Sequence, residues 1–196
     1  MTRQPRIPPR PPSDWDAEVL DALSVMMRRE DLKAGEGNER GAPPVINALA
    51  VLMRYPALAK AFLTFNRHLL LGSSLPGRIR ELLILRIGWI RRAEYEWAQH
   101  VALASRVGIR KEEIEAVKEG PGAVVWTPFE SALLRAVDEL HADAFVSDAT
   151  WDVLAAHLDQ RQLMDLVFTV GAYDLLAMAF NTFGLELDPG LKGFEG

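Results

Sequence analysis

Apolar residues recur at intervals of three and four along most of the chain, and no segment alternates apolar and polar residues as a half-buried strand does. This spacing gives each segment one apolar face when it is coiled into a helix. It predicts helices over residues 13–26, 45–55, 56–71, 76–90, 94–108, 110–119, 127–141, 148–158 and 159–184. The pattern therefore predicts an all-α protein, a bundle of about eight helices, or nine if every segment forms one.

The stretch from Pro76 to Gly108 is the most apolar part of this pattern, and we expect the other helices to pack around it. Its first half is apolar around the whole helix, which is typical of a buried helix rather than a surface one. A break is expected at Arg91–Arg92–Ala93, and Gly108 suits a helix C-terminus. The stretch thus predicts two helices that fold back on each other as a central hairpin.

The ends of several helices can also be predicted. Residues with capping-box spacing mark three helix starts: Ser13 with Asp16, Thr127 with Glu130, and Asp159 with Gln162. Residues 1–12 hold five prolines and three arginines, which predicts an extended arm without a core of its own. This arm is either a disordered tail or a segment that lies across a neighbouring subunit. Residues 31–44, rich in glycine, proline and charge, predict a loop.

Composition narrows the class of protein. With 196 residues, 49% hydrophobic and 25% charged, we expect a single domain over residues 13–196. A net charge of −5 and a pI near 5.4 argue against a nucleic-acid partner, which requires a basic surface. No apolar run approaches the roughly 18 residues of a membrane span, and the N-terminus lacks the apolar segment of a secretory signal. We therefore expect a cytoplasmic protein without a membrane partner.

Three polar side chains interrupt the apolar hairpin: Glu81, Glu96 and His100. Glu96 and His100 are four residues apart and share one face of the second helix, and Glu81 reaches the same cavity if the helices fold back. Two carboxylates and an imidazole in an apolar crevice suit acid–base catalysis. In this interpretation His100 moves the proton, Glu96 orients His100, and Glu81 is the second acid–base group.

Each of these residues also has a different interpretation. His100 can be an ordinary core histidine, and Glu81 can form a buried ion pair with Arg80 or Arg86. Two carboxylates and one histidine could also bind a divalent ion. No paired His-x-x-x-His spacing supports that use, so we expect no metal and no other cofactor.

Three further residues are candidates for binding a substrate. Tyr95, at the start of the second helix, could donate a hydrogen bond to a substrate oxygen. A substrate carboxylate could be held by an arginine of this stretch, for which Arg86 and Arg91 are the chosen candidates. No spacing distinguishes them from Arg80 and Arg92.

The sequence RELLIL at residues 80–85, followed by EYEWAQH at residues 94–100, resembles the carboxymuconolactone decarboxylase family over residues 45–118. The resemblance implies the alkylhydroperoxidase D-like helical fold and a homo-oligomer, either a trimer or a hexamer. Glu81 and His100 stand at positions of the shared motif. In the peroxidase branch a Cys-x-x-Cys pair stands where this chain has Ala93 and Glu96, and this chain has no cysteine at all.

The resemblance implies cofactor-independent lyase or isomerase chemistry on a small carboxylated lactone or a related acid. A thiol peroxidase is not expected, because no thiolate exists to attack a peroxide. The alternative is a non-catalytic oligomeric helical protein that binds a small ligand or a protein partner.

Overall fold

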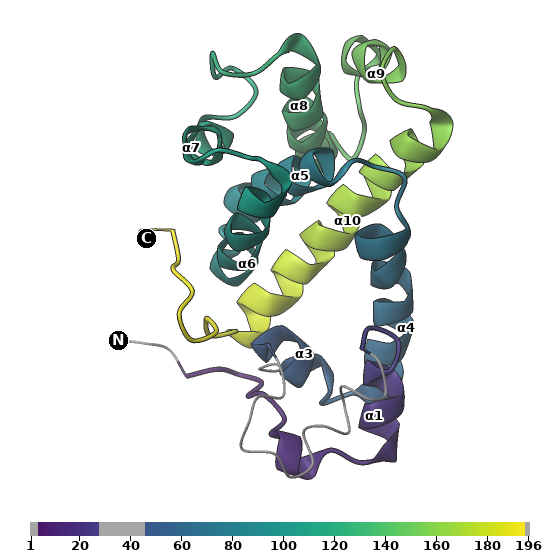
Figure 1. Ribbon diagram of the computed structural model, residues 1–196, viewed down its shortest axis with the longest axis vertical. Helices are drawn as coiled ribbons and strands as arrows, with labels where there is room; N and C mark the ends of the chain where they lie inside the picture. The colour runs from purple at the N-terminus through teal and green to yellow at the C-terminus, as the bar shows by residue number, and fades with distance from the viewer. Residues whose placement is uncertain (1–3, 28–45, 195–196) are drawn as a thin grey trace. The chain divides into compact units, whose positions relative to one another are not determined.

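The computed structural model describes residues 4–27 and 46–194, and this part of the chain is all-α (Figure 1). Its α-helices are α1 (Ala17–Leu23), α3 (Asn47–Leu52), α4 (Pro56–Arg67), α5 (Gly77–Ile90), α6 (Glu94–Ala104), α7 (Lys111–Glu119), α8 (Pro128–Asp143), α9 (Asp148–Ala155) and α10 (Gln160–Phe183). No strand occurs in the described residues. The predicted fold class is thus confirmed, while the predicted loop over residues 31–44 lies outside the described residues.

The chain groups into two compact units, each described here by itself. Unit 1 comprises residues up to 72 together with 182–188, and unit 2 comprises residues 73–181 and 189–196. The expectation of one domain over residues 13–196 stays a prediction.

Unit 1 is built from α1, α3 and α4 around a small apolar core. Val19, Leu23, Met53 and Leu63 are almost completely buried within it. Most of the predicted N-terminal arm lies on this unit of its own chain: the backbone N–H of Arg10 donates to the Ala50 carbonyl at 2.9 Å. Further hydrogen bonds join the arm to the Phe183 carbonyl and to the Arg54 side chain, so the arm is held by other segments of unit 1, as proline-rich chain without internal hydrogen bonds requires.

The first helix does not begin at Ser13, as the capping-box spacing predicted. Ser13 lies in a short 3₁₀ turn, Pro12–Asp14, and Trp15 then takes an extended conformation that no helix can pass through. Asp16 is the actual cap, since its carboxylate accepts from the backbone N–H groups of Glu18 and Val19 at 3.1 and 3.0 Å. The carboxylate satisfies two N–H groups that would otherwise lack a partner at the helix start.

Unit 2 is organised around α5, which packs against α6, α7 and α8. Residues 82–85 and Ile87 are completely buried, so α5 is covered on all sides, as its apolar sequence predicted. The break between α5 and α6 is confirmed at Arg91–Arg92–Ala93. Arg92 makes the turn with a φ of 52°, and its guanidinium lies 4.5 Å from the centre of the Trp89 ring.

An arginine of α5 ties two further helices to this hairpin. The guanidinium of Arg78 contacts Glu113 of α7 and Glu130 of α8, both at 2.7 Å. Glu130 also completes the predicted capping box with Thr127, and the helix begins at Pro128 as expected. These contacts fix the ends of α7 and α8 against the first turn of α5.

The longest helix, α10, passes beside the α5–α6 hairpin in unit 2 (Figure 1). Asp159 and Gln162 cap its start reciprocally, as predicted, and Gly184 follows its last residue with a φ of 74°. Within the described part of the chain, α10 alone is long and apolar enough to cross a membrane, and 56% of its most apolar window is buried. A mostly buried helix of this kind is also what a protein core contains.

Candidate active site

The hairpin brings Glu81 of α5 and His100 of α6 into direct contact. The Oε2 atom of Glu81 lies 2.6 Å from Nδ1 of His100. Glu81 is completely buried and His100 is 7% exposed, so bulk water does not weaken this contact. The carboxylate can only accept, so Nδ1 carries the hydrogen and Nε2 of a neutral ring is the proton acceptor.

A cation on the neighbouring residue supports the ionised form of Glu81. The Nε atom of Arg80 donates to Oε1 of Glu81 at 3.2 Å, so each carboxylate oxygen has a partner. Burial alone would raise the pKa of Glu81, but the hydrogen bond and charge of His100, together with Arg80, outweigh it and lower that pKa below its usual value. Glu81 is thus a carboxylate that holds the imidazole.

The ring of Tyr173 on α10 closes the site from the other side. It meets His100 edge to face, with the ring centres 5.0 Å apart and the planes at 87°. Burial raises the pKa of Tyr173 above its usual value, and the negative charge of Glu81 acts in the same direction. The phenol therefore stays neutral and able to donate a hydrogen bond.

Glu96 lies one helical turn before His100 and is in a very different state from Glu81. It is 3% exposed, and neither carboxylate oxygen has a hydrogen-bond partner among the described residues. Burial, and next the charge of Asp174 on α10, raises the pKa of Glu96 well above its usual value. The raised pKa favours the protonated, neutral form of Glu96, whose hydroxyl has no acceptor among the described residues.

The prediction that Glu96 orients His100 is wrong: the structure gives this role to Glu81. Helical spacing puts Glu96 and His100 on one face but does not make their side chains meet. Glu81 is 19 residues away in sequence and arrives only because the hairpin folds back. The expectation that Glu81 reaches the same place as His100 is confirmed.

The three predicted substrate-binding residues are engaged elsewhere in unit 2. Arg86 binds both carboxylate oxygens of Asp138 at 2.7 and 2.9 Å and donates to the Val117 carbonyl, which connects α5 with α7 and α8. Arg91 is paired with Asp174 of α10. The hydroxyl of Tyr95 accepts from Gln99 at 3.1 Å. Their roles toward a substrate stay predictions, and both arginines would have to leave an ion pair to fulfil them.

Sequence reasoning missed the contributions of α10. Tyr173 and Asp174 are adjacent polar residues in the middle of an apolar helix, and this interruption was the available signal. No spacing in the sequence connects α10 with the hairpin, so their contact with the site could not be derived. Within residues 4–27 and 46–194, no group of three or more His, Cys, Asp or Glu residues is arranged to hold a metal.

Part of the chain, including the site residues, matches a known family model. Residues 56–139 match the model of the carboxymuconolactone decarboxylase family. This segment carries Glu81, Glu96 and His100. No curated protein matches the chain.

Solved structures share the fold along nearly the whole chain. An uncharacterized peroxidase-related protein from Ralstonia eutropha JMP134, described as an alkylhydroperoxidase AhpD core, is 17% identical with a TM-score of 0.74, covering 96% of this chain and 95% of its own. A peroxidase-related protein from Silicibacter sp. TM1040 is also 17% identical, with a TM-score of 0.71 and 96% of each chain covered.

A third structure is the debrominase Bmp8 in complex with 2,3,4-tribromopyrrole, which is 14% identical, with a TM-score of 0.70 over 93% of this chain and 91% of its own. At these identities the likeness concerns the fold, which is alkylhydroperoxidase D-like. Residues 56–139 are thus similar to the carboxymuconolactone decarboxylase family, and the chain lacks the cysteine pair of the peroxidase branch.

Proposed function

We propose that this protein is a cofactor-independent acid–base catalyst, a lyase or isomerase acting on a small carboxylated lactone or a related acid. The observation that supports this most is the buried contact of 2.6 Å between Glu81 and His100, beside a second glutamate without a partner. Two carboxyl groups whose surroundings move their pKa values in opposite directions are typical of an acid–base pair. We also propose that it works in the cytoplasm.

In this proposal His100 moves the proton. Decarboxylation breaks a carbon–carbon bond, releases CO₂, leaves the electron pair on the lactone as an enolate and consumes one proton. Isomerisation removes a proton from one carbon and returns it to another. Both reactions need a group that exchanges a proton near neutral pH, which an imidazole does. Glu81 keeps the ring in place and stabilises its charged form.

Glu96 would stabilise the charge that develops on the substrate. As a neutral acid in an apolar setting, it can donate a hydrogen bond to an enolate oxygen without first losing water. The guanidinium of Arg80, which already contacts Glu81, is the cation nearest the pair and the candidate to attract the substrate carboxylate. Tyr173 covers the other side of His100.

Thiol chemistry is not part of the proposal. Two of the compared structures are described as peroxidase-related and the third as a debrominase crystallised as a Cys-to-Ala variant. This chain has no cysteine, so it has neither a thiolate to attack a peroxide nor a disulfide to reduce. We expect no reductant-dependent turnover of alkyl hydroperoxides.

The test is turnover of a panel of unsaturated lactones carrying a carboxylate, followed as CO₂ release and as a change in ultraviolet absorbance. On any substrate found, His100→Gln is expected to lower kcat about 100- to 10,000-fold, the usual contribution of a positioned acid–base group. His157→Gln, which changes an exposed histidine of unit 2, is the matched control and should retain full activity.

Two results would contradict the proposal. Equal activity of the folded His100→Gln variant and the wild type would show that the site is wrongly assigned. Stabilisation by carboxylated lactones without any turnover would instead favour the alternative, a ligand-binding protein.

A further inference from the structure

The outer face of α10 carries a row of apolar side chains exposed to solvent. We call it the α10 seam: Met164, Phe168, Gly171, Leu175 and Met178. The four side chains larger than glycine are 61%, 53%, 53% and 47% exposed in chain order. Scattered exposed apolar residues are ordinary, but a continuous row on one helix marks an interaction surface.

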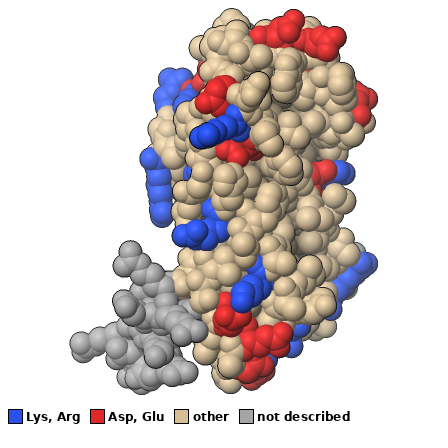
Figure 2. Space-filling model, turned by 90° about the vertical axis from the view of Figure 1, so that its right-hand side faces the viewer, with Lys and Arg blue, Asp and Glu red and all other residues tan. Residues whose placement is uncertain are grey.

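The spacing of the seam is that of a helix-packing face. Successive members are separated by four, three, four and three residues, the repeat by which two helices pack side by side. None of the five is charged. Figure 2 shows acidic and basic side chains on one face of the described part of the molecule.

Gly171 stands at the centre of the seam and is not explained by the rest of this chain. A glycine inside a helix costs about 1 kcal/mol relative to alanine. A Cβ atom added at Gly171 would meet nothing within 4 Å, so no neighbour in the structure requires its absence. A missing side chain at the middle of an apolar row allows another helix to approach closely at that point.

The seam is complementary to itself in the antiparallel direction. Met164 and Met178 are each seven residues from Gly171, and Phe168 and Leu175 are three and four residues from it. Two copies crossing at Gly171 would therefore match methionine with methionine and phenylalanine with leucine. Antiparallel helices also bring opposite ends of their dipoles together.

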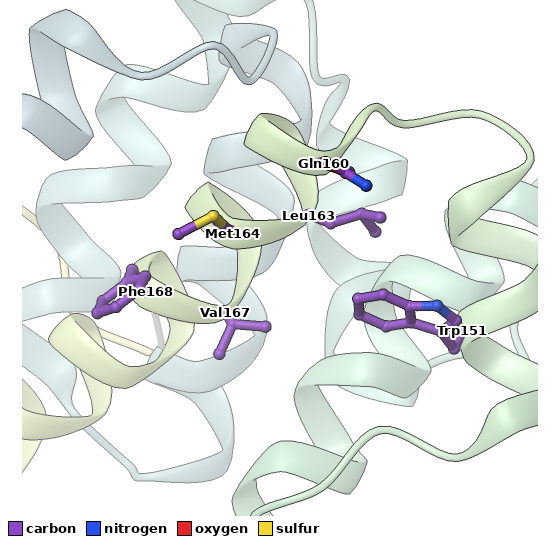
Figure 3. Close-up of a pocket in the computed structure, with 6 residues that line it drawn as sticks. All are labelled: Trp151, Gln160, Leu163, Met164, Val167 and Phe168. Atoms are coloured by element: carbon purple, nitrogen blue, oxygen red, sulfur yellow. The ribbon is translucent and has the colours of Figure 1, made fainter.

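A hollow beside the seam supports the same arrangement. It measures about 410 Å³ and lies between α9 and α10, lined by Trp151, Gln160, Leu163, Met164, Val167 and Phe168 (Figure 3). Because Met164 lines the hollow, the antiparallel register brings Met178 of the partner subunit to its edge. A flexible methionine is suited to fill an irregular apolar gap.

The exposed apolar side chains supply a large part of the area that an interface between two copies needs. Aromatic side chains carry about 150–250 Å² each, so Phe145, Trp151 and Phe168 leave roughly 240–400 Å² uncovered at 64%, 41% and 53% exposure. The aliphatic side chains of the seam add to this. A specific interface buries about 800 Å² per partner, and its centre is apolar.

We propose that two copies of this chain pair through the α10 seam, antiparallel and related by a two-fold axis at Gly171. Such a contact builds a dimer, or a hexamer assembled from three dimers. It cannot build a trimer by itself, because a three-fold ring has no two-fold contact.

Cysteine scanning tests the register, because the chain has no cysteine of its own. A mixture of Phe168→Cys and Leu175→Cys is expected to give a disulfide-linked mixed dimer on mild oxidation. A mixture of Met164→Cys and Met178→Cys should give a mixed dimer, while each variant alone stays largely uncrosslinked. Val124→Cys, fully exposed and away from the seam, is the control and should stay monomeric in denaturing gels. Efficient self-linking of Met164→Cys alone would overturn the antiparallel register.

Sedimentation velocity tests the interface itself. The wild type should be a dimer or hexamer at micromolar concentration, and Leu175→Glu should weaken association roughly 100-fold or more, since it buries two like charges. Val124→Glu is the matched control. A wild type that is monomeric or trimeric overturns the proposal, as does a monomer whose seam instead binds neutral phosphatidylcholine vesicles, with binding lost in Leu175→Glu.

Discussion

The α5–α6 hairpin and the outer face of α10 depart from the usual distribution of polar and apolar residues in opposite directions. In the hairpin, Glu81, Glu96 and His100 are buried among apolar side chains. On α10, methionine, phenylalanine and leucine face solvent. Burying an ionisable group lowers the stability of the folded chain, because the group loses its contact with water. An apolar row that stays exposed does not contribute the stabilisation that its burial would give.

The buried ionisable residues and the exposed apolar residues serve different functions in this account. The polar groups inside unit 2 are an arrangement for moving protons, in which a paired carboxylate and an unpaired acid stand near one imidazole. The apolar groups outside are an arrangement for packing against another helix. Sequences usually break the pattern of their fold where function requires it. The two functions can be separated by measuring the free energy of unfolding, its dependence on pH and the strength of association.

The largest effect on stability is expected from Glu81→Ala. This change leaves the buried His100 without its carboxylate partner and removes the contact with Arg80, and breaking a buried charged contact costs about 3–5 kcal/mol. The loss is measured as the difference in the free energy of unfolding between the variant and the wild type, obtained from urea denaturation. Glu115→Ala is the matched control, because its exposed pair with Lys118 is worth less than about 1 kcal/mol. Equal losses in the two variants would mean that Glu81 is not held as described.

Glu96 is expected to make stability depend on pH with the opposite sign from Glu81. Its pKa is raised in the folded protein, so above the ordinary value of 4.5 the unfolded chain loses a proton that the folded chain keeps. Stability should therefore fall as pH rises from 4.5 toward the raised pKa, by up to about 1.4 kcal/mol per pH unit. The pKa of Glu81 is lowered, so its contribution is present above 4.5 and is lost as pH falls through the lowered value.

Urea denaturation across pH 4–9 compares the wild type with Glu96→Gln. The variant cannot ionise at this position, so it should gain stability relative to the wild type as pH rises. Glu113→Gln controls for a general effect of removing a buried carboxylate, because Arg78 lowers the pKa of Glu113 to about 2 and its titration lies below this range. A constant difference between Glu96→Gln and the wild type across the range would contradict a neutral Glu96.

The smallest effect is expected from Gly171→Ala and has two parts of opposite sign. In the separate chain the added methyl group meets nothing, so the helix should gain about 0.5–1 kcal/mol of stability. In the assembly it should weaken association by hindering close approach of two helices. Thermal unfolding at dilute and concentrated protein distinguishes the two parts. A gain in stability that is equal at both concentrations would count against the crossing point at Gly171.

Much of the fold could be predicted from the sequence because its signals are local. The capping pairs Thr127 with Glu130 and Asp159 with Gln162 act within one turn, and the hairpin break depends on adjacent residues. The start of α1 was mispredicted because Ser13 and Asp16 are both good caps, and only the structure shows that Trp15 between them is extended, so that the helix begins after Asp16.

The site was only partly predictable because its contacts are not local. The three residues Glu81, Glu96 and His100 could be selected, since ionisable groups in an apolar hairpin are unusual. Their roles could not be predicted from the sequence. Helical spacing favours Glu96 as the partner of His100, and only the packing of α5 against α6 makes Glu81 that partner. The edge contact from Tyr173 depends on how α10 packs, which no spacing in the sequence encodes.

The most direct test of the central claim, that Glu81 holds His100 as the proton-moving group, is nitrogen-15 NMR of the His100 ring. In the neutral form of the ring we predict a proton on Nδ1 and none on Nε2, and Glu81→Gln should shift the Nδ1 signal. A neutral ring protonated on Nε2, or signals that Glu81→Gln leaves unchanged, would contradict the account.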